Sequence, residues 1–172
     1  MILAAQRLTL APLTLDDAPD LYALMSDAEA MAFRDAVEIT DAAAAADLLA
    51  DRLAAVAEGV ALHWALRRND DGAFLGCCEL SDIDRHHRRA ATGFLVARAH
   101  WGADYELEAM HAVISHAAQA LRLRRLSASA HLADHHAITV LQQLGFRREG
   151  VLRGAVVRDG ERRDGLVMGL SL

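Results

Sequence analysis

The spacing of apolar positions changes several times along the 172-residue chain, and each change predicts a new structural element. Leu8 and Leu10 alternate with polar neighbours, which predicts a first strand. Two helices should follow, because Thr14, and then Thr40 or Asp41, precede apolar residues that recur at helical spacing. The first part of the chain is therefore expected to run strand, helix, helix.

The rest of the chain alternates between strand-like and helix-like spacing. Period-two patterns predict strands, and the clearest helix is expected where Leu107, Met110 and Ile114 share one face. Asp134 can cap a later helix, which Gly145 would end. The predicted strands are 62–66, 74–80, 90–97, 126–131 and two more on either side of a turn at 158–161. The polar segment 81–89 is predicted to connect the second and third of these strands. The predicted helices in this part of the chain are 104–121 and 135–144.

This order of elements predicts an α/β (α+β) fold with a mixed central sheet of about seven strands flanked by about four helices. The length suits one domain that covers residues 1–172, and no repeat or linker interrupts the pattern. We therefore expect every functional group to lie on one sheet and its helices.

Composition and charge narrow the class of function. The net charge of −6 argues against a nucleic-acid-binding surface and mildly favours cationic partners such as amines. The first residues resemble no signal peptide, and no apolar run is long enough to span a membrane, so we expect a cytoplasmic protein. Cys77 and Cys78 are adjacent in a predicted strand and should point to opposite faces, which makes them a poor disulfide or metal pair.

Three strings, taken with the order of elements, resemble the GNAT N-acetyltransferase superfamily, and most closely its RimJ/RimL-like branch of ribosomal-protein N-terminal alanine acetyltransferases. The strings are RLTLAPLTLDDAPDL near the start, TGFLV followed by WG in the middle, and AITVLQQLGFRREGVLR near the end. The resemblance spans nearly the whole chain, and the last string is the most specific.

The resemblance implies acetyl-CoA as the cofactor, wedged where the strands 90–97 and 126–131 splay apart. An amine of a small molecule or of a peptide N-terminus would attack the thioester directly, without a covalent enzyme intermediate. Family habit also favours a homodimer. The residues that the resemblance places at the cofactor are Phe94, Leu95, Val96, Trp101, Gly102, Ala103, Asp104, Tyr105, Asp134 and Ala137.

The chain departs from the family pattern at several of these positions. Asp104 stands where relatives carry a second glycine, and a carboxylate about 4 Å from a phosphate would repel it by roughly 4 kcal/mol at an effective dielectric constant near 20. The same residue could instead cap the following helix. Asp134 and Ala137 replace an asparagine and a serine that contact the cofactor in relatives. The cofactor motif therefore looks degenerate.

Two residues, Glu79 and His131, are candidates for catalysis. Relatives often carry a glutamate just before the Gly-Phe pair, where this chain has Ala91 and Thr92. Glu79 on the neighbouring strand could replace it as a base, and His131 at the end of the strand 126–131 could act as a base or proton relay. The nine histidines show no metal-ligand spacing, so we expect surface histidines and no metal site.

The acceptor pocket in this fold is expected between the first two helices and the last two strands. Candidate lining residues are Phe33, Arg34, Trp64, Arg153 and Asp164. Three readings of the function stay open: an acetyl-CoA-dependent N-acyltransferase, a non-catalytic GNAT-like binding module that has lost acetyl-CoA, and an enzyme that uses a different acyl donor.

Overall fold

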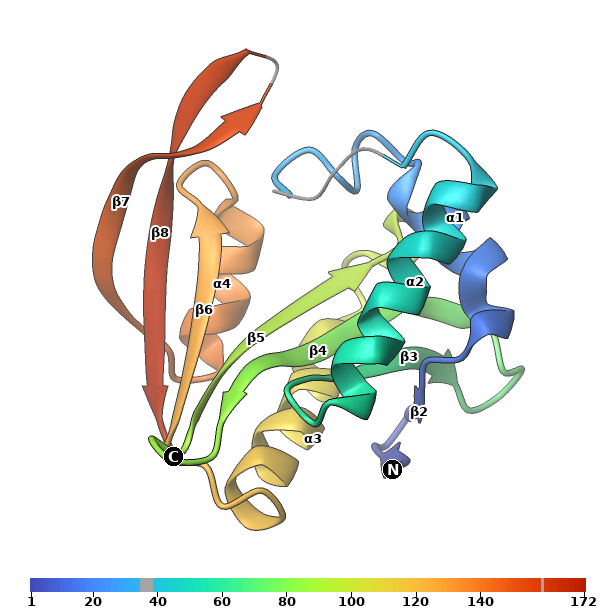
Figure 1. Ribbon diagram of the computed structural model, residues 1–172, viewed down its shortest axis with the longest axis horizontal. Helices are drawn as coiled ribbons and strands as arrows, with labels where there is room; N and C mark the ends of the chain where they lie inside the picture. The colour runs from blue at the N-terminus through green and yellow to red at the C-terminus, as the bar shows by residue number, and fades with distance from the viewer. Residues whose placement is uncertain (35–38, 159) are drawn as a thin grey trace.

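The computed structural model describes residues 1–34, 39–158 and 160–172 (Figure 1). Its strands form one eight-stranded sheet in the order β1-β2-β3-β4-β5-β6-β8-β7. The strands are β1 (Leu3–Ala4), β2 (Leu8–Pro12), β3 (Leu62–Arg68), β4 (Phe74–Asp84), β5 (Arg89–Val96), β6 (Arg125–His131), β7 (Arg147–Arg158) and β8 (Glu161–Ser171). The helices are α1 (Ala18–Met25), α2 (Ala42–Ala57), α3 (Tyr105–Gln119) and α4 (His135–Gln143), with 3₁₀ turns η1 (Leu15–Asp17) and η2 (Arg98–His100).

The predicted fold class and order of elements are confirmed, with two differences in the sheet. Strand β1 is two residues long, too short to leave a periodic pattern. The segment 81–89 was predicted as a connection, but β4 continues through it to Asp84. A register shift after Ser81, with a left-handed φ of 50° at Asp82, lets the strand resume and bury Ile83.

Capping chemistry explains where the helices begin. The Asp41 carboxylate accepts a hydrogen bond from the Ala44 N–H at 2.8 Å, and the Asp134 carboxylate accepts one from the Ala137 N–H at 2.9 Å. Of the two predicted caps for α2, the structure selects Asp41. The predicted hairpin turn at 158–161 includes residue 159, which lies outside the described residues.

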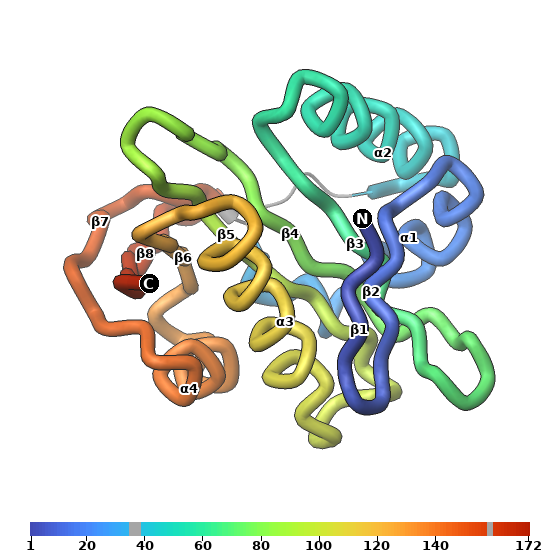
Figure 2. The backbone as a smooth tube through the Cα atoms, turned by 90° about the horizontal axis from the view of Figure 1, so that it is seen from below, coloured from blue at the N-terminus to red at the C-terminus, as the bar shows by residue number. Residues whose placement is uncertain are grey.

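Helices cover both faces of the sheet and bury two separate apolar clusters (Figure 2). Helices α1 and α2 lie on one face, and α3 and α4 lie on the other. Neighbouring strand residues alternate between the two clusters, so Cys77 packs under α1 and α2 while Cys78 packs under α3, as predicted. Among the described helices, none is long and apolar enough to cross a membrane.

Strands β5 and β6 form the parallel pair of the sheet, and they stay together only at their start. Pairing joins Arg89–Ala91 to Arg125–Ser127 and then ends, so the remainder of β5 is paired only with β4. Strand β6 continues along β8 instead. Figure 1 shows the two strands leaving a common point and diverging as a V. The predicted splay is therefore present.

Candidate functional site

A cavity of about 360 Å³ lies where β5 diverges from β6. The end of β5, the loop before α3, the start of α4 and the segment after α1 all contribute to its wall (Figure 1). Most of that wall is apolar, which is typical of a small-molecule site. The lining residues are Glu29, Ala30, Phe33, Arg34, Phe94, Leu95, Val96, Trp101, Gly102, Glu106, Asp134, His136 and Ala137.

The structure brings together most of the residues that the resemblance places at a cofactor. Seven of them lie on the cavity wall, as do two of the candidate acceptor residues. Trp101 also fixes the free edge of β5, because its indole N–H donates to the Val96 carbonyl at 2.9 Å. The nine wall residues are Phe94, Leu95, Val96, Trp101, Gly102, Asp134, Ala137, Phe33 and Arg34.

The other three candidates, Ala103, Asp104 and Tyr105, lie on the loop but outside the cavity wall. Arg7 holds this side of the loop. Its guanidinium donates to the Ala103 carbonyl at 2.9 Å, pairs with Glu108 at 2.7 Å and stacks 4.6 Å from the centre of the Tyr105 ring. These contacts give the loop a fixed shape without any contribution from a ligand.

Asp104 occupies the N-cap position of α3, but its side chain caps nothing. It makes no capping hydrogen bond, it is exposed, and its backbone is left-handed, with φ 56° and ψ 27°. The alternative that its carboxylate caps the helix is therefore wrong. A left-handed backbone explains why glycine suits this position, since glycine alone adopts it without steric cost.

Glu106 is a carboxylate that the sequence analysis did not single out, and it lies at the inner wall of the cavity. Its side chain is 2% exposed. One oxygen contacts His136 Nε2 at 2.6 Å, whereas the other, Oε2, is buried without a hydrogen-bond partner among the described residues. Glu106 shares one helix face with Met110 and Val113. An acidic residue on an otherwise apolar helix face was therefore the feature of the sequence that could have identified it.

Glu79 borders a second cavity of about 170 Å³ on the α1/α2 face of β4 and β5. His63 lies directly opposite Glu79 on β3, and its Nδ1 contacts Glu79 Oε2 at 3.0 Å. The hydrogen bond from His63 lowers the pKa of Glu79, against the opposing effect of burial. Glu79 is therefore ionised at neutral pH. Arg34, Phe94 and Leu95 line this cavity as well as the first, so the two adjoin.

His131 borders a third cavity, of about 110 Å³, which shares Phe33, Arg34, Asp134 and Ala137 with the first. Its Nδ1 accepts a hydrogen bond from the Ala133 N–H at 3.1 Å, so the proton of the neutral ring is on Nε2. Nε2 is buried and has no partner among the described residues. The ring packs 5.4 Å from Phe33, centre to centre.

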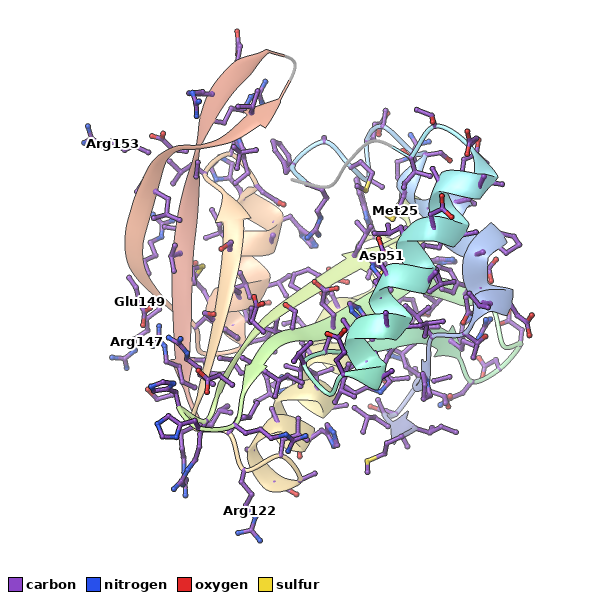
Figure 3. The ribbon with its side chains drawn as sticks, in the orientation of Figure 1. Met25, Asp51, Arg122, Arg147, Glu149 and Arg153 are labelled. Atoms are coloured by element: carbon purple, nitrogen blue, oxygen red, sulfur yellow. The ribbon has the colours of Figure 1, made fainter. Side chains whose placement is uncertain are left out.

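Three candidate acceptor residues lie away from these cavities. Trp64 is buried in the core beneath α3, where its indole N–H donates to the Met1 carbonyl at 3.0 Å. Asp164 accepts a hydrogen bond from the Gly154 N–H at 2.8 Å and so stabilises the irregular β7–β8 pairing. Arg153 is exposed and points outward from β7 (Figure 3). The position of each of these side chains depends on which face of the sheet its strand residue occupies. A shift of one residue in strand register would reverse that face, and the sequence alone does not determine the register.

The comparisons with known proteins agree with this geometry. The family model described as an acetyltransferase (GNAT) domain matches residues 7–147. The uncharacterized N-acetyltransferase p20 of Bacillus licheniformis is 30% identical over 151 residues, which is 88% of this chain and 85% of p20.

Two solved structures share the fold at lower sequence identity. Mycobacterium smegmatis RimJ in complex with CoA-disulfide superposes with a TM-score of 0.90 at 20% identity, covering 99% of this chain and 87% of that one. RimL, a ribosomal L7/L12 alpha-N-protein acetyltransferase in complex with coenzyme A, gives 0.90 at 15% identity, covering 100% and 98%. With the family model spanning most of its length and a V-shaped opening between β5 and β6, this chain belongs to the GNAT family of N-acetyltransferases.

Proposed function

We propose that this protein binds acetyl-CoA in the cavity between β5 and β6 and transfers the acetyl group to a primary amine held in the adjoining Glu79 cavity. The observation that carries the proposal is the V-shaped divergence of the two strands with a cavity at its open end. The cofactor would supply an activated acetyl thioester. The residues of the chain would bind the cofactor and the amine, orient them and exchange protons with them.

The cavity wall suits the elongated, amide-bearing arm of CoA. From Thr92 to Val96 the edge of β5 that faces β6 has no strand partner. Glu106 Oε2 is a buried acceptor without a donor among the described residues, and an amide N–H from a ligand would satisfy it. An apolar wall with a few convergent polar groups is what such an arm requires.

Asp104 does not close this site. Its carboxylate is exposed and outside the cavity wall, so the repulsion expected from the sequence is that of a solvent-screened surface charge. Phe94, Leu95 and Val96 on β5 would hold the arm of the cofactor, and the loop before α3, which includes Trp101 and Gly102, would bring backbone N–H groups near the phosphates. These observations favour a protein that still binds acetyl-CoA over a binding module that has lost the cofactor.

Glu79 is suited to receive the ammonium form of the acceptor. Its carboxylate is ionised at neutral pH, borders the second cavity and faces Gly93, whose missing side chain leaves the space beside it open. The ammonium must lose one proton before its nitrogen can form a bond, and Glu79 supplies a carboxylate on the wall of this cavity. His63 holds the other oxygen of Glu79 in place.

His131 is suited to hold a proton on the opposite side of the cavity. Its Nε2–H faces the third cavity, which adjoins the first, and the hydrogen bond to Nδ1 fixes this tautomer. A hydrogen bond donated by Nε2–H can stabilise negative charge that develops on a leaving sulfur, which then takes its proton from solvent. The proposal therefore makes His131 a hydrogen-bond donor to the sulfur, whereas the sequence suggested a base or relay.

The test is calorimetry with acetyl-CoA, followed by measurement of CoA release with primary amines. Micromolar binding and amine-dependent release are expected for the native protein. Ala137→Phe would fill the cavity and should abolish binding, while Ala43→Phe on the exposed start of α2 should leave it unchanged. Folding of both variants is checked by circular dichroism. No heat at millimolar acetyl-CoA would overturn the proposal in favour of a non-catalytic binding module.

A further inference from the structure

The cavity beside Glu79 also has a positively charged group, Arg52, on its wall. The guanidinium of Arg52 would repel a simple alkylammonium acceptor that carried no negative charge of its own.

Arg52 provides the sharper observation. Its Nη1 is buried and has no hydrogen-bond partner among the described residues. Its charge nevertheless acts on the cavity, because after His63 it helps to lower the pKa of Glu79, and it opposes the rise that burial causes in the pKa of the Cys77 thiol. A buried guanidinium nitrogen without an acceptor is costly, and a carboxylate is the partner that best matches its geometry.

The rest of the cavity defines where an amine would lie relative to that carboxylate. His63, Glu79 and Gly93 form one row across β3, β4 and β5. A Cβ added at Gly93 would approach Glu79 Oε1 to 3.5 Å, so glycine leaves room for a ligand atom there. The ammonium of an acceptor would therefore lie against the sheet beside Glu79, and the guanidinium of Arg52 would contact the acceptor from the side of α2.

We propose that the acceptor is a free α-amino acid, with its ammonium at Glu79 and its carboxylate at Arg52. The cavity measures about 170 Å³, below the roughly 300–1,000 Å³ of pockets for larger ligands. A peptide N-terminus also carries an ammonium, but its first carbonyl belongs to an amide and brings no negative charge to Arg52. Charge and size together favour a single amino acid.

This inference rests on the proposed function, since the acetyl donor is placed in the adjoining cavity. In the reaction, the amino nitrogen forms a bond to the acetyl carbon and the carbon–sulfur bond breaks. One proton leaves the ammonium and one proton ends on the sulfur of CoA. The products are an N-acetyl amino acid and free CoA, and no oxidant or reductant is required.

The experiment compares each neutral amino acid with its carboxamide, which keeps the ammonium and side chain but lacks the negative charge. We expect the native protein to favour the acid over the amide in kcat/KM, and Arg52→Met to reduce that ratio by about 10- to 100-fold. Arg52→Lys should retain part of the preference. Arg147→Met, at an exposed arginine on β7, is the matched control and should leave the ratio unchanged (Figure 3).

Binding measurements separate this inference from the proposed function. Calorimetry with the same acid and amide pairs, in the presence of CoA, reports on the Arg52 site even without turnover. The inference is supported if the native protein prefers the acid to the amide and Arg52→Met removes that preference. Equal use or equal binding of acid and amide, or a preference that survives Arg52→Met, overturns it while leaving acetyl transfer intact. Absence of acetyl-CoA binding overturns the proposed function instead.

Discussion

At the scale of single residues, Asp104 combines a backbone cost with an exposed charge near the expected phosphates. Asp104→Gly should raise the free energy of unfolding by about 1 kcal/mol, because glycine removes the cost of the left-handed conformation. Asp104→Asn tolerates that conformation and removes only the charge. Denaturant unfolding of the two variants measures the difference, and equal stability would show that the backbone is not strained.

The same pair of variants tests the charge. Both should bind acetyl-CoA up to about fivefold more tightly at low salt, which corresponds to a surface interaction of at most about 1 kcal/mol. The gain should shrink as salt is added. Calorimetry at two ionic strengths measures it. A gain for Asp104→Gly alone would assign the effect to loop conformation.

Two aspartates at the surface, Asp84 and Asp71, should titrate unusually low. The His87 backbone N–H and ring lower the pKa of Asp84 to about 2, and the Arg68 guanidinium with the Ala73 N–H lowers that of Asp71 to about 2. The unfolded value is about 3.9, so the stability that each contributes is complete above pH 3.9 and is lost as the pH falls through about 2. Carboxyl NMR titration checks this, and values near 4 would contradict it.

At the scale of elements, the sequence predicted helices better than strand ends. Caps such as Asp41 and Asp134 are local and fix where a helix begins. The irregular continuation of β4 to Asp84 depends instead on pairing with β5, which no local pattern encodes. Glu106 was missed although its place on the apolar stripe of α3 was an available signal, whereas the cavity that Arg52 on α2 faces became known only with the packing.

The β4–β5 pair should be sensitive to one methyl group. A Cβ at Gly76 would overlap the backbone carbonyl oxygen of Leu95, whereas one at Gly150 would meet nothing within 4 Å. Gly76→Ala should therefore lower the free energy of unfolding by about 1–3 kcal/mol through overpacking. Gly150→Ala is the control and should change it by less than about 0.5 kcal/mol. Thermal or urea unfolding measures the free energy of unfolding of both variants. Equal losses for Gly76→Ala and Gly150→Ala would contradict the close approach of Gly76 to Leu95.

At the scale of the whole molecule, the sheet separates two apolar clusters and buries one cysteine in each. Burial raises the pKa of Cys77 and raises that of Cys78 further. Neither thiol should react with a thiol reagent in the native protein at pH 8, and both should react in denaturant. Rapid native modification of Cys78 would show that the cluster under α3 opens readily.

The family, the splay and the cavity wall followed from the sequence to a large extent, since motif strings carry information about the whole fold. Which face each strand residue occupies did not follow. Trp64, Arg153 and Asp164 were predicted from where the acceptor pocket usually lies in this fold, and the structure places them outside the three cavities described above. Side-chain contacts such as that of Glu79 with His63 arise from the register between strands, which requires the assembled sheet.

The central claim is that the V between β5 and β6 is where acetyl-CoA binds. Backbone amide NMR spectra recorded while acetyl-CoA is added test it most directly. We expect shifts concentrated at 92–96, 101–106 and 134–137, on the wall of the cavity and directly beside it, with little change along β7. Shifts confined to β7 and β8, or none at millimolar acetyl-CoA, would contradict it.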